Sequence, residues 1–173
     1  MSTSSLYVVA SELVQTRIKG FRKGTSIPTY THSQNVYETL LKYNLPEDVT
    51  LAGLLHDIIE DSNTTLNELT QLGFSPRTIA LVSLCTHDIT MQEGDARWVK
   101  MIARLIDAND TDAWLIKLAD LLDNARSCHT MSPERERFNK QTKVPLLLSV
   151  TKSLVGNHGI WKELEEFYLK SQE

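Results

Sequence analysis

Four ionisable side chains occur within positions 56–61 of an otherwise apolar stretch, namely His56, Asp57, Glu60 and Asp61. If the stretch is helical, the first two lie beside the last two, because side chains four residues apart share a face. A carboxylate that is removed from water must be paired, hydrogen-bonded or bound to a metal ion. These residues therefore predict either a solvated acidic helix end with one satisfied histidine, or a site that binds a cation.

A second apolar stretch, residues 114–122, carries one carboxylate in its interior, Asp120, with Asn124 one turn later. A helix that is apolar on most of its faces is usually central in a fold. Asp120 therefore also needs a partner. The partner is either a cation such as Lys117 or Arg126, or a metal ion that Asp120 shares with the first cluster.

A third segment supplies His32, close to a predicted helix start. Alone, a histidine there is usually a cap or a surface residue. With the two clusters, however, it completes a set of two imidazoles and two carboxylates from three predicted helices: His32, His56, Asp57 and Asp120. Mixed ligands of this kind suit a divalent ion such as Mn, Fe, Zn, Ni or Co. Such an ion can lower the pKa of a bound water and orient a phosphate ester, which would leave Glu60 and Asp61 free to carry protons or hold the water.

Four basic residues precede His32 in the sequence: Arg17, Lys19, Arg22 and Lys23. The ordinary interpretation is a solvated helix end followed by a glycine-containing turn. The functional interpretation is a clamp for ligand phosphates, or an arginine that stacks on a base. The residues themselves leave both interpretations open.

The composition limits the kinds of partner that such a site can take. The chain has 173 residues, 41% of them hydrophobic, and a net charge of -4 from 18 basic and 22 acidic residues. A nucleic-acid polymer is not an expected partner, because binding to its phosphates needs a basic surplus, whereas a small phosphorylated ligand needs only a local basic cluster. The sequence predicts no membrane span and no signal peptide. Cys85 and Cys128 are expected to be reduced thiols of a cytoplasmic protein.

The apolar periodicity is helical nearly throughout, and no alternating strand pattern of any length is present. We therefore predict an all-α single domain over residues 1–173 with about eight helices. The expected helical segments are 5–21, 32–44, about 46–60, 65–73, about 76–87, 95–107, 111–127, one from 132 that Pro145 kinks or breaks, and 159–171.

The order of the candidate ligands, His32, then His56-Asp57, then Asp120, resembles the HD phosphohydrolase superfamily. A narrower resemblance is carried by RKGTSIPTYTH, LAGLLHDIIEDS and LIKLADLLDNARS, which are similar to segments of the RelA/SpoT hydrolase domain. This resemblance covers residues of about 5–130 and is weak over the C-terminal helices, 132–171. The chain is too short for the synthetase and regulatory domains of the long enzymes. It resembles a stand-alone small alarmone hydrolase, similar to the metazoan SpoT homologue class.

The resemblance implies an HD-type helical bundle that binds one metal ion, Mn²⁺ in most relatives. The implied metal ligands are His32, His56, Asp57 and Asp120. The implied catalytic pair, which acts on the attacking water, is Glu60 and Asp61. The implied substrate-binding residues, for the base, phosphates and sugar of a small nucleotide, are Arg22, Lys23, Asn124 and Ser127. No oligomeric state is implied.

The reaction that the resemblance implies is hydrolysis of the 3′-pyrophosphate of guanosine tetra- or pentaphosphate, which yields pyrophosphate and GDP or GTP. The chain departs from the family pattern at several pocket positions, where Thr29, Ser33, Leu121 and Asp123 replace Tyr, Pro, Arg and His. The nucleotide is therefore left open, an adenosine alarmone included. The alternatives are an HD-type nucleotidase or phosphodiesterase that acts on another nucleotide, and a non-catalytic nucleotide-binding or antitoxin protein.

Overall fold

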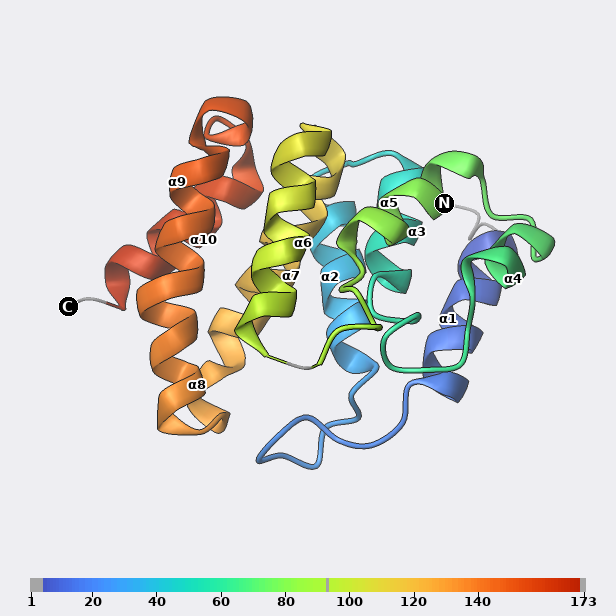
Figure 1. The fold of residues 1–173 in the computed structure, drawn as a ribbon, viewed down its shortest axis with the longest axis horizontal. Coiled ribbons are helices and arrows are strands. Elements are labelled where there is room, and N and C mark those ends of the chain that lie inside the picture. The colour runs from blue at the N-terminus through green and yellow to red at the C-terminus, as the bar shows by residue number, and fades with distance from the viewer. Residues whose placement is uncertain (1–4, 93, 172–173) are drawn as a thin grey trace.

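The computed structural model describes residues 5–92 and 94–171, and these form a helical bundle (Figure 1). In chain order its α-helices are α1 (Ser5–Arg17), α2 (Thr31–Lys42), α3 (Glu47–Leu55), α4 (Leu66–Gln71), α5 (Pro76–Cys85), α6 (Asp95–Ala108), α7 (Thr111–Ser127), α8 (Pro133–Phe138), α9 (Val144–Val155) and α10 (Gly159–Lys170). A 3-10 turn (Cys128–Thr130) and a π-turn (Asn139–Lys143) lie between α7 and α9.

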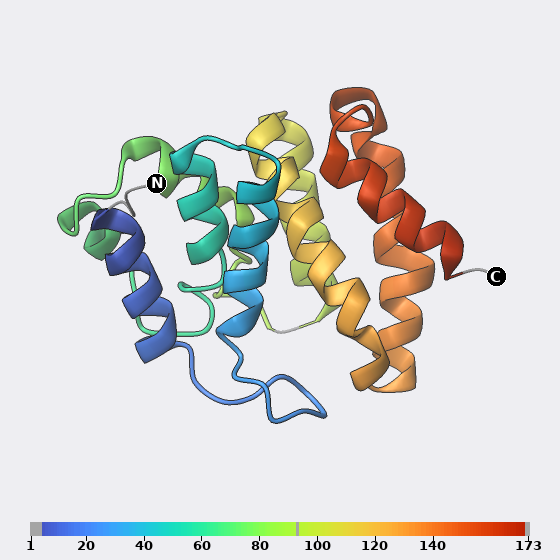
Figure 2. The ribbon, with the colours of Figure 1, turned by 180° about the vertical axis from the view of Figure 1, so that it is seen from behind.

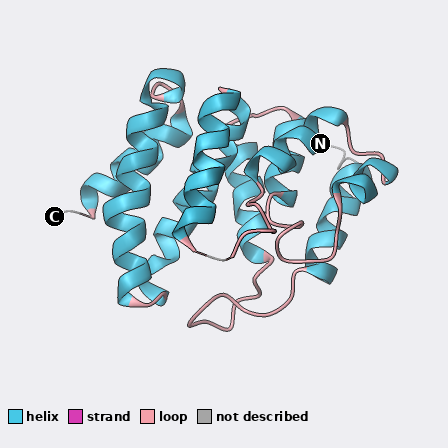
Figure 3. Cartoon of the chain, viewed as in Figure 1, coloured by secondary structure: helices cyan, strands magenta, loops and turns pink. Residues whose placement is uncertain are grey.

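The predicted all-α class is confirmed. Figure 3 shows helices and loops over the described ranges, where the one β-type pairing is an isolated bridge between Phe21 and Pro28. None of the described helices combines the length and the apolar character that a membrane span needs.

Helix α7 lies in the middle of the bundle, as the apolar run at residues 114–122 predicts. Seen from behind in Figure 2, it lies between α2 on one side and the pair α9 and α10 on the other. Nearly every residue from Ala113 to Ala125 is buried, including the charged Lys117, Asp120 and Asp123. A polar residue within this buried part of the helix therefore faces other protein elements, whichever side of the helix it is on.

Close packing of α2 on α3 depends on a glycine. A Cβ at Gly53 would lie 2.2 Å from Leu40 Cδ1 and 3.4 Å from Val36 Cγ1, both on α2. The side chains of α2 thus pack directly on the α3 backbone. This contact brings the beginning of α2 towards the end of α3, where the two histidines lie.

Side-chain caps fix the start of several helices. Thr65 and Ser75 accept hydrogen bonds from the N–H groups of Glu68 and Thr78. At α7 the cap is Asp110, whose carboxylate accepts from the N–H groups of Asp112 (3.0 Å) and Ala113 (3.2 Å). The hydrogen bonds of Asp110 therefore define the start of α7 at Thr111.

The largest differences from the expected helix ends occur in two helices. Helix α1 stops at Arg17, not at residue 21, and the loop that follows it contains Gly20 at φ 85° and Gly24 at φ 74°. Left-handed backbone of this kind does not continue an α-helix. A Cβ at Gly24 would also lie 2.6 Å from the carbonyl oxygen of Thr130, so the loop approaches the end of α7 closely.

Helix α3 ends at Leu55, whereas the sequence predicts a helix to about residue 60. The His56 ring donates from Nδ1 to the carbonyl oxygen of Gly53 at 2.7 Å. That carbonyl is the acceptor that the Asp57 N–H would use if the helix continued. The chain instead passes into turns in which the N–H groups of Glu60 and Asp61 both bond to the Asp57 carbonyl oxygen.

Candidate metal centre

Three elements contribute the four side chains predicted to bind a metal. His32 is the second residue of α2, His56 and Asp57 follow the last residue of α3, and Asp120 lies within α7. Helix α2 packs on both α3 and α7. The structure therefore brings together residues that are far apart in the sequence.

The potential ligand atoms of His32, His56 and Asp57 lie within 4.8 Å of one another. His32 Nε2 lies 3.7 Å from Asp57 Oδ2, and His56 Nε2 lies 3.2 Å from Asp57 Oδ1. Asp120 Oδ1 completes the group, 3.1 Å from His32 Nε2 and 3.9 Å from His56 Nε2. Two imidazole nitrogens and two carboxylates thus face one point.

His56 provides the test of whether this point suits a cation. Its side chain is fully buried, and its Nδ1–H is used by the Gly53 carbonyl. Its Nε2 lies 3.2 Å from Asp57 Oδ1, and this contact lacks the geometry of a hydrogen bond in the described part of the chain. A buried nitrogen without a good hydrogen bond is costly. In the neutral form of His56 this nitrogen, which lies beside two carboxylates, is a suitable donor for a divalent ion. The residues present therefore fit a metal.

The charges of the group also depend on one another. Burial by itself would lower the pKa of His32, but hydrogen bonds to Asp120 and Asp123 outweigh it and raise that pKa to about 10. Burial would raise the pKa of Asp57, whereas the attraction of His56 and His32 lowers it to about 2. The carboxylates are thus held ionised by neighbouring positive charge, a role that a metal cation can also fill.

Asp120 uses its two oxygens differently. Oδ1 faces the histidines and accepts a hydrogen bond from Asn124 Nδ2 at 2.6 Å, while Oδ2 forms a short ion pair with Lys117. Of the cations considered for this carboxylate, Lys117 contacts it, whereas Arg126 pairs with Glu163. Asn124, predicted to bind substrate, supports a candidate metal ligand in this structure.

Asp123 has a role that sequence reasoning missed, since it was noted only as a departure from the family pattern. Its Oδ2 lies 2.6 Å from His32 Nδ1 and 2.5 Å from Arg22 Nη1, and its Oδ1 accepts from Asn35 at 2.8 Å. A carboxylate on the outer nitrogen of a ligating histidine fixes the ring and its tautomer. The available signal was the spacing, because Asp123 follows Asp120 by three residues and so shares its face of α7.

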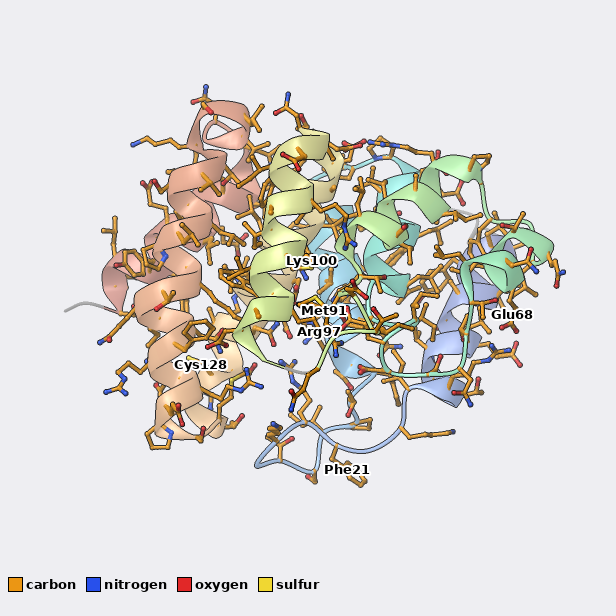
Figure 4. All side chains as sticks on the ribbon, in the orientation of Figure 1. Phe21, Glu68, Met91, Arg97, Lys100 and Cys128 are labelled. Carbon is orange, nitrogen blue, oxygen red and sulfur yellow. The ribbon has the colours of Figure 1, made fainter. Side chains whose placement is uncertain are left out.

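The predicted catalytic pair has two different environments. Glu60 is held firmly, because Oε1 accepts from the His87 backbone N–H at 2.7 Å and Oε2 contacts His87 Nδ1 at 2.7 Å and Arg97 Nη2 at 3.0 Å. Figure 4 shows Arg97 between α6 and the loop that follows α5. Asp61 is exposed and is close enough to Asp57 and Glu60 to feel their charge. Neither His87 nor Arg97 gives a sequence signal, because each is distant along the chain from Glu60.

The pKa values of the two acids move apart. Burial would raise the pKa of Glu60, but the hydrogen bonds from His87 leave it below its usual value. Reduced solvation, together with the negative charges of Asp57 and Glu60, raises the pKa of Asp61 to about 6. Of the pair, Asp61 is therefore the group that can exchange a proton near neutral pH.

The remaining predicted substrate residues lie around a cavity beside the cluster. Its volume is about 270 Å³, and Arg22, Lys23, His32, Asn124 and Ser127 are among the residues that line it. Arg22 is already engaged, since Nη2 donates to Ser127 Oγ at 2.7 Å in addition to its ion pair with Asp123. A second cavity of about 200 Å³ is lined by the candidate ligands Asp57 and Asp120.

A family model described as an HD domain matches residues 10–144. The chain belongs to the HD-domain family. This membership confirms the superfamily that the order of histidines and aspartates indicates, and the matched range includes all four candidate ligands.

Relatives of this HD domain include much longer proteins. The chain is 29% identical over 156 residues to a guanosine-3′,5′-bis(diphosphate) 3′-pyrophosphohydrolase of Aquifex aeolicus, covering 86% of this chain and 21% of that protein. It is 32% identical over 158 residues to a GTP pyrophosphokinase of Myxococcus xanthus, covering 84% and 20%. The chain therefore spans about a fifth of the length of these relatives.

A solved structure of a metazoan ortholog of SpoT, a protein that hydrolyses ppGpp, matches the fold over nearly its whole length. The TM-score is 0.81, with 24% sequence identity and coverage of 99% of this chain and 98% of that one. The fold likeness thus extends over the C-terminal helices, where the sequence resemblance is weak.

Proposed function

We propose that this HD domain is a metal-dependent pyrophosphohydrolase. It removes the 3′-pyrophosphate of guanosine tetra- or pentaphosphate and releases pyrophosphate with GDP or GTP. The observation that carries the proposal is the cluster of two histidines and two carboxylates, which borders two adjoining cavities and in which the buried Nε2 of His56 makes no hydrogen bond of good geometry. The activities named for the Aquifex and metazoan relatives support the choice of substrate.

The proposed cofactor is Mn²⁺, held by His32, His56, Asp57 and Asp120. When bound, a divalent ion of this kind supplies Lewis-acid activation of water and neutralises charge on phosphoryl oxygens. The protein supplies the geometry around it. Asp123 and the Gly53 carbonyl hold the outer nitrogens of the two histidines, so that both Nε2 atoms point towards the carboxylates.

The two acids beside the cluster have separate proposed roles. Glu60 is fixed as an anion by His87 and Arg97 and orients the attacking water. Asp61 is exposed and accepts or returns a proton. Two acids with separated pKa values can divide these tasks, as catalytic carboxyl pairs commonly do.

The proposed ligand is a small nucleotide that lies in the cavities, with Arg22, Lys23, Asn124 and Ser127 on its path. The proposed location is the cytoplasm, where buried, unbridged thiols such as Cys85 and Cys128 stay reduced.

The experiment is to incubate the manganese-loaded chain with guanosine tetraphosphate, its adenosine analogue and ordinary nucleotides, and to identify the products. We expect GDP and pyrophosphate in equal amounts from guanosine tetraphosphate. Glu60→Gln should keep its metal and lose activity by roughly 100-fold or more. Glu68→Gln is the matched control, because Glu68 pairs with Arg17 away from the cluster.

Three results would contradict the proposal in different ways. Release of orthophosphate would indicate a nucleotidase, and tight binding without turnover in Mn²⁺ would indicate a nucleotide-binding protein. A wild-type rate in Glu60→Gln would remove the role given to that carboxylate.

A further inference from the structure

Lys143 lies where three cavities meet. One, of about 200 Å³, contains Asp57 and Asp120, and the one of about 270 Å³ contains His32. A third, of about 160 Å³, contains Glu60. Among the described residues Lys143 is the side chain common to all three walls. A group bound beside the metal ligands would therefore come close to its ammonium.

The helix around Lys143 has an unusual turn that explains its position. Residues 139–143 form a π-turn between α8 and α9, just before Pro145. A proline in a helix has no N–H to donate and its ring collides with the carbonyl four residues earlier, which favours a local wide turn. A π-turn contains more residues per turn than an α-turn. Side chains four residues apart therefore point to the same side of the helix here.

The residues with this spacing all line the cavities. Arg135, Asn139 and Lys143 line the cavity that contains His32, and Asn139, Lys143 and Leu147 line the one that contains Asp120. The sequence after Ser132 thus presents a polar and basic stripe to the site, in the part of the chain where the family resemblance is weak.

The ammonium of Lys143 is held by aromatic rings. Nζ lies 5.3 Å from the centre of the Trp98 ring and 5.5 Å from that of Phe138, and the two rings meet edge to face. Cation–π contacts of this kind position an ammonium without neutralising it. Burial lowers the pKa of Lys143, as expected for a cation without an anionic partner.

Other cations near the cluster are already paired with carboxylates. Arg22 pairs with Asp123, Arg97 with Glu60 and Lys117 with Asp120. Three cations that line the cavities have no ion pair within residues 5–92 and 94–171, namely Lys23, Arg135 and Lys143. In a chain with a net charge of -4, this local group of unpaired cations is suited to an anion.

We propose that Lys143 is a phosphate-binding residue that holds the pyrophosphate portion of the ligand where the three cavities meet, with the exposed Arg135 and Lys23 nearer the mouth. This inference rests on the proposed function only for the identity of the ligand. Lys143 and Arg135 lie outside the metal cluster and after the three segments that carry the narrower resemblance, whereas Lys23 lies within the first of those segments.

The test is a calorimetric titration of the full chain with inorganic pyrophosphate, with the metal content measured in the same samples. We expect Lys143→Met to weaken pyrophosphate binding roughly 10- to 100-fold, with its metal content and unfolding temperature unchanged. Lys143→Arg should retain most of the affinity, because it keeps the charge. Lys152→Met is the matched control, since Lys152 is exposed on α9 and its Nζ lies 6.0 Å from the Trp161 ring, away from these cavities.

Wild-type affinity in Lys143→Met would overturn the inference. An equal loss in Lys152→Met would also overturn it, because the effect would then reflect overall charge. The outcome is distinguishable from failure of the proposed function. Suppose that the wild-type chain does not hydrolyse guanosine tetraphosphate, and that Lys143→Met alone weakens pyrophosphate binding. The proposed substrate would then be wrong, whereas the proposed phosphate-binding role of Lys143 would stand.

Discussion

Asp123 contacts two side chains that have different proposed roles. It contacts the outer nitrogen of His32, a candidate metal ligand, and the guanidinium of Arg22, a candidate nucleotide ligand. The same oxygen makes both contacts, so a change in one affects the other. The Asp123 carboxylate thus holds both the His32 ring and the Arg22 side chain in place.

Replacement of this carboxylate gives a test at the level of one residue. Asp123→Asn keeps the shape but removes the charge that holds His32 and Arg22. We expect the affinity for Mn²⁺ to fall roughly 10- to 100-fold, measured by competition with a chelator of known affinity. Asp107→Asn, an equal change at an exposed position of α6, should bind metal as the wild type does. Equal affinities in the two variants would show that Asp123 does not support the metal group.

The sequence alone predicts which residue types meet at the cluster, because a buried carboxylate or imidazole in an apolar helix demands a partner. It does not predict the supporting contacts. His87 and Arg97 reach Glu60 only through the packing of α5 and α6 around the turn after α3. Contacts of this kind depend on tertiary structure, which local spacing does not encode.

At the level of elements, helix starts are more predictable than helix ends. The helix starts expected at residues 76, 95 and 111 are the observed ones, and Ser75 and Asp110 cap two of these helices. The end of α3 depends on the His56 ring, which takes a backbone carbonyl oxygen. Pro145 correctly indicates a disturbed helix, but its outcome is a π-turn that places Asn139 and Lys143 at the site.

Asp110 gives a test at this level because it serves two elements. It caps α7, and it accepts bidentate hydrogen bonds from Arg77 of α5 at 2.5 and 2.9 Å. We expect Asp110→Ala to lower the free energy of unfolding by about 1–3 kcal/mol, measured by urea denaturation. Asp110→Asn should lose less, because an asparagine still caps a helix. An Asp110→Ala variant as stable as the wild type would show that the α7 cap and the Arg77 pair do not stabilise the fold.

At the level of the whole molecule, Glu163 links three helices. Its carboxylate contacts Lys42 at 2.9 Å, the Tyr43 hydroxyl at the end of α2 at 2.6 Å, and Arg126 of α7. Burial would raise the pKa of Glu163, but these partners lower it from 4.5 to about 2. The C-terminal helix α10 is thereby tied to the helices that carry the site.

The pH dependence of stability follows from that shift. Because the folded-state pKa is lowered, the contribution is complete above pH 4.5 and is lost as the pH falls from 4.5 towards 2. We expect Glu163→Gln to be less stable than the wild type by about 1–2 kcal/mol at pH 7. The difference should shrink towards zero as the pH is lowered through this range, as measured by denaturation at several pH values. A difference that does not depend on pH would show that the ion pairs are not its source.

The most direct test of the site is the metal content of the purified chain after loading with Mn²⁺ and removal of free ion. We expect one divalent ion per wild-type chain. His56→Ala and Asp120→Ala should each lose it while keeping the helical circular dichroism spectrum. A wild-type chain that holds no divalent ion, or variants that hold as much as the wild type, would contradict the assignment of these four side chains to one cation.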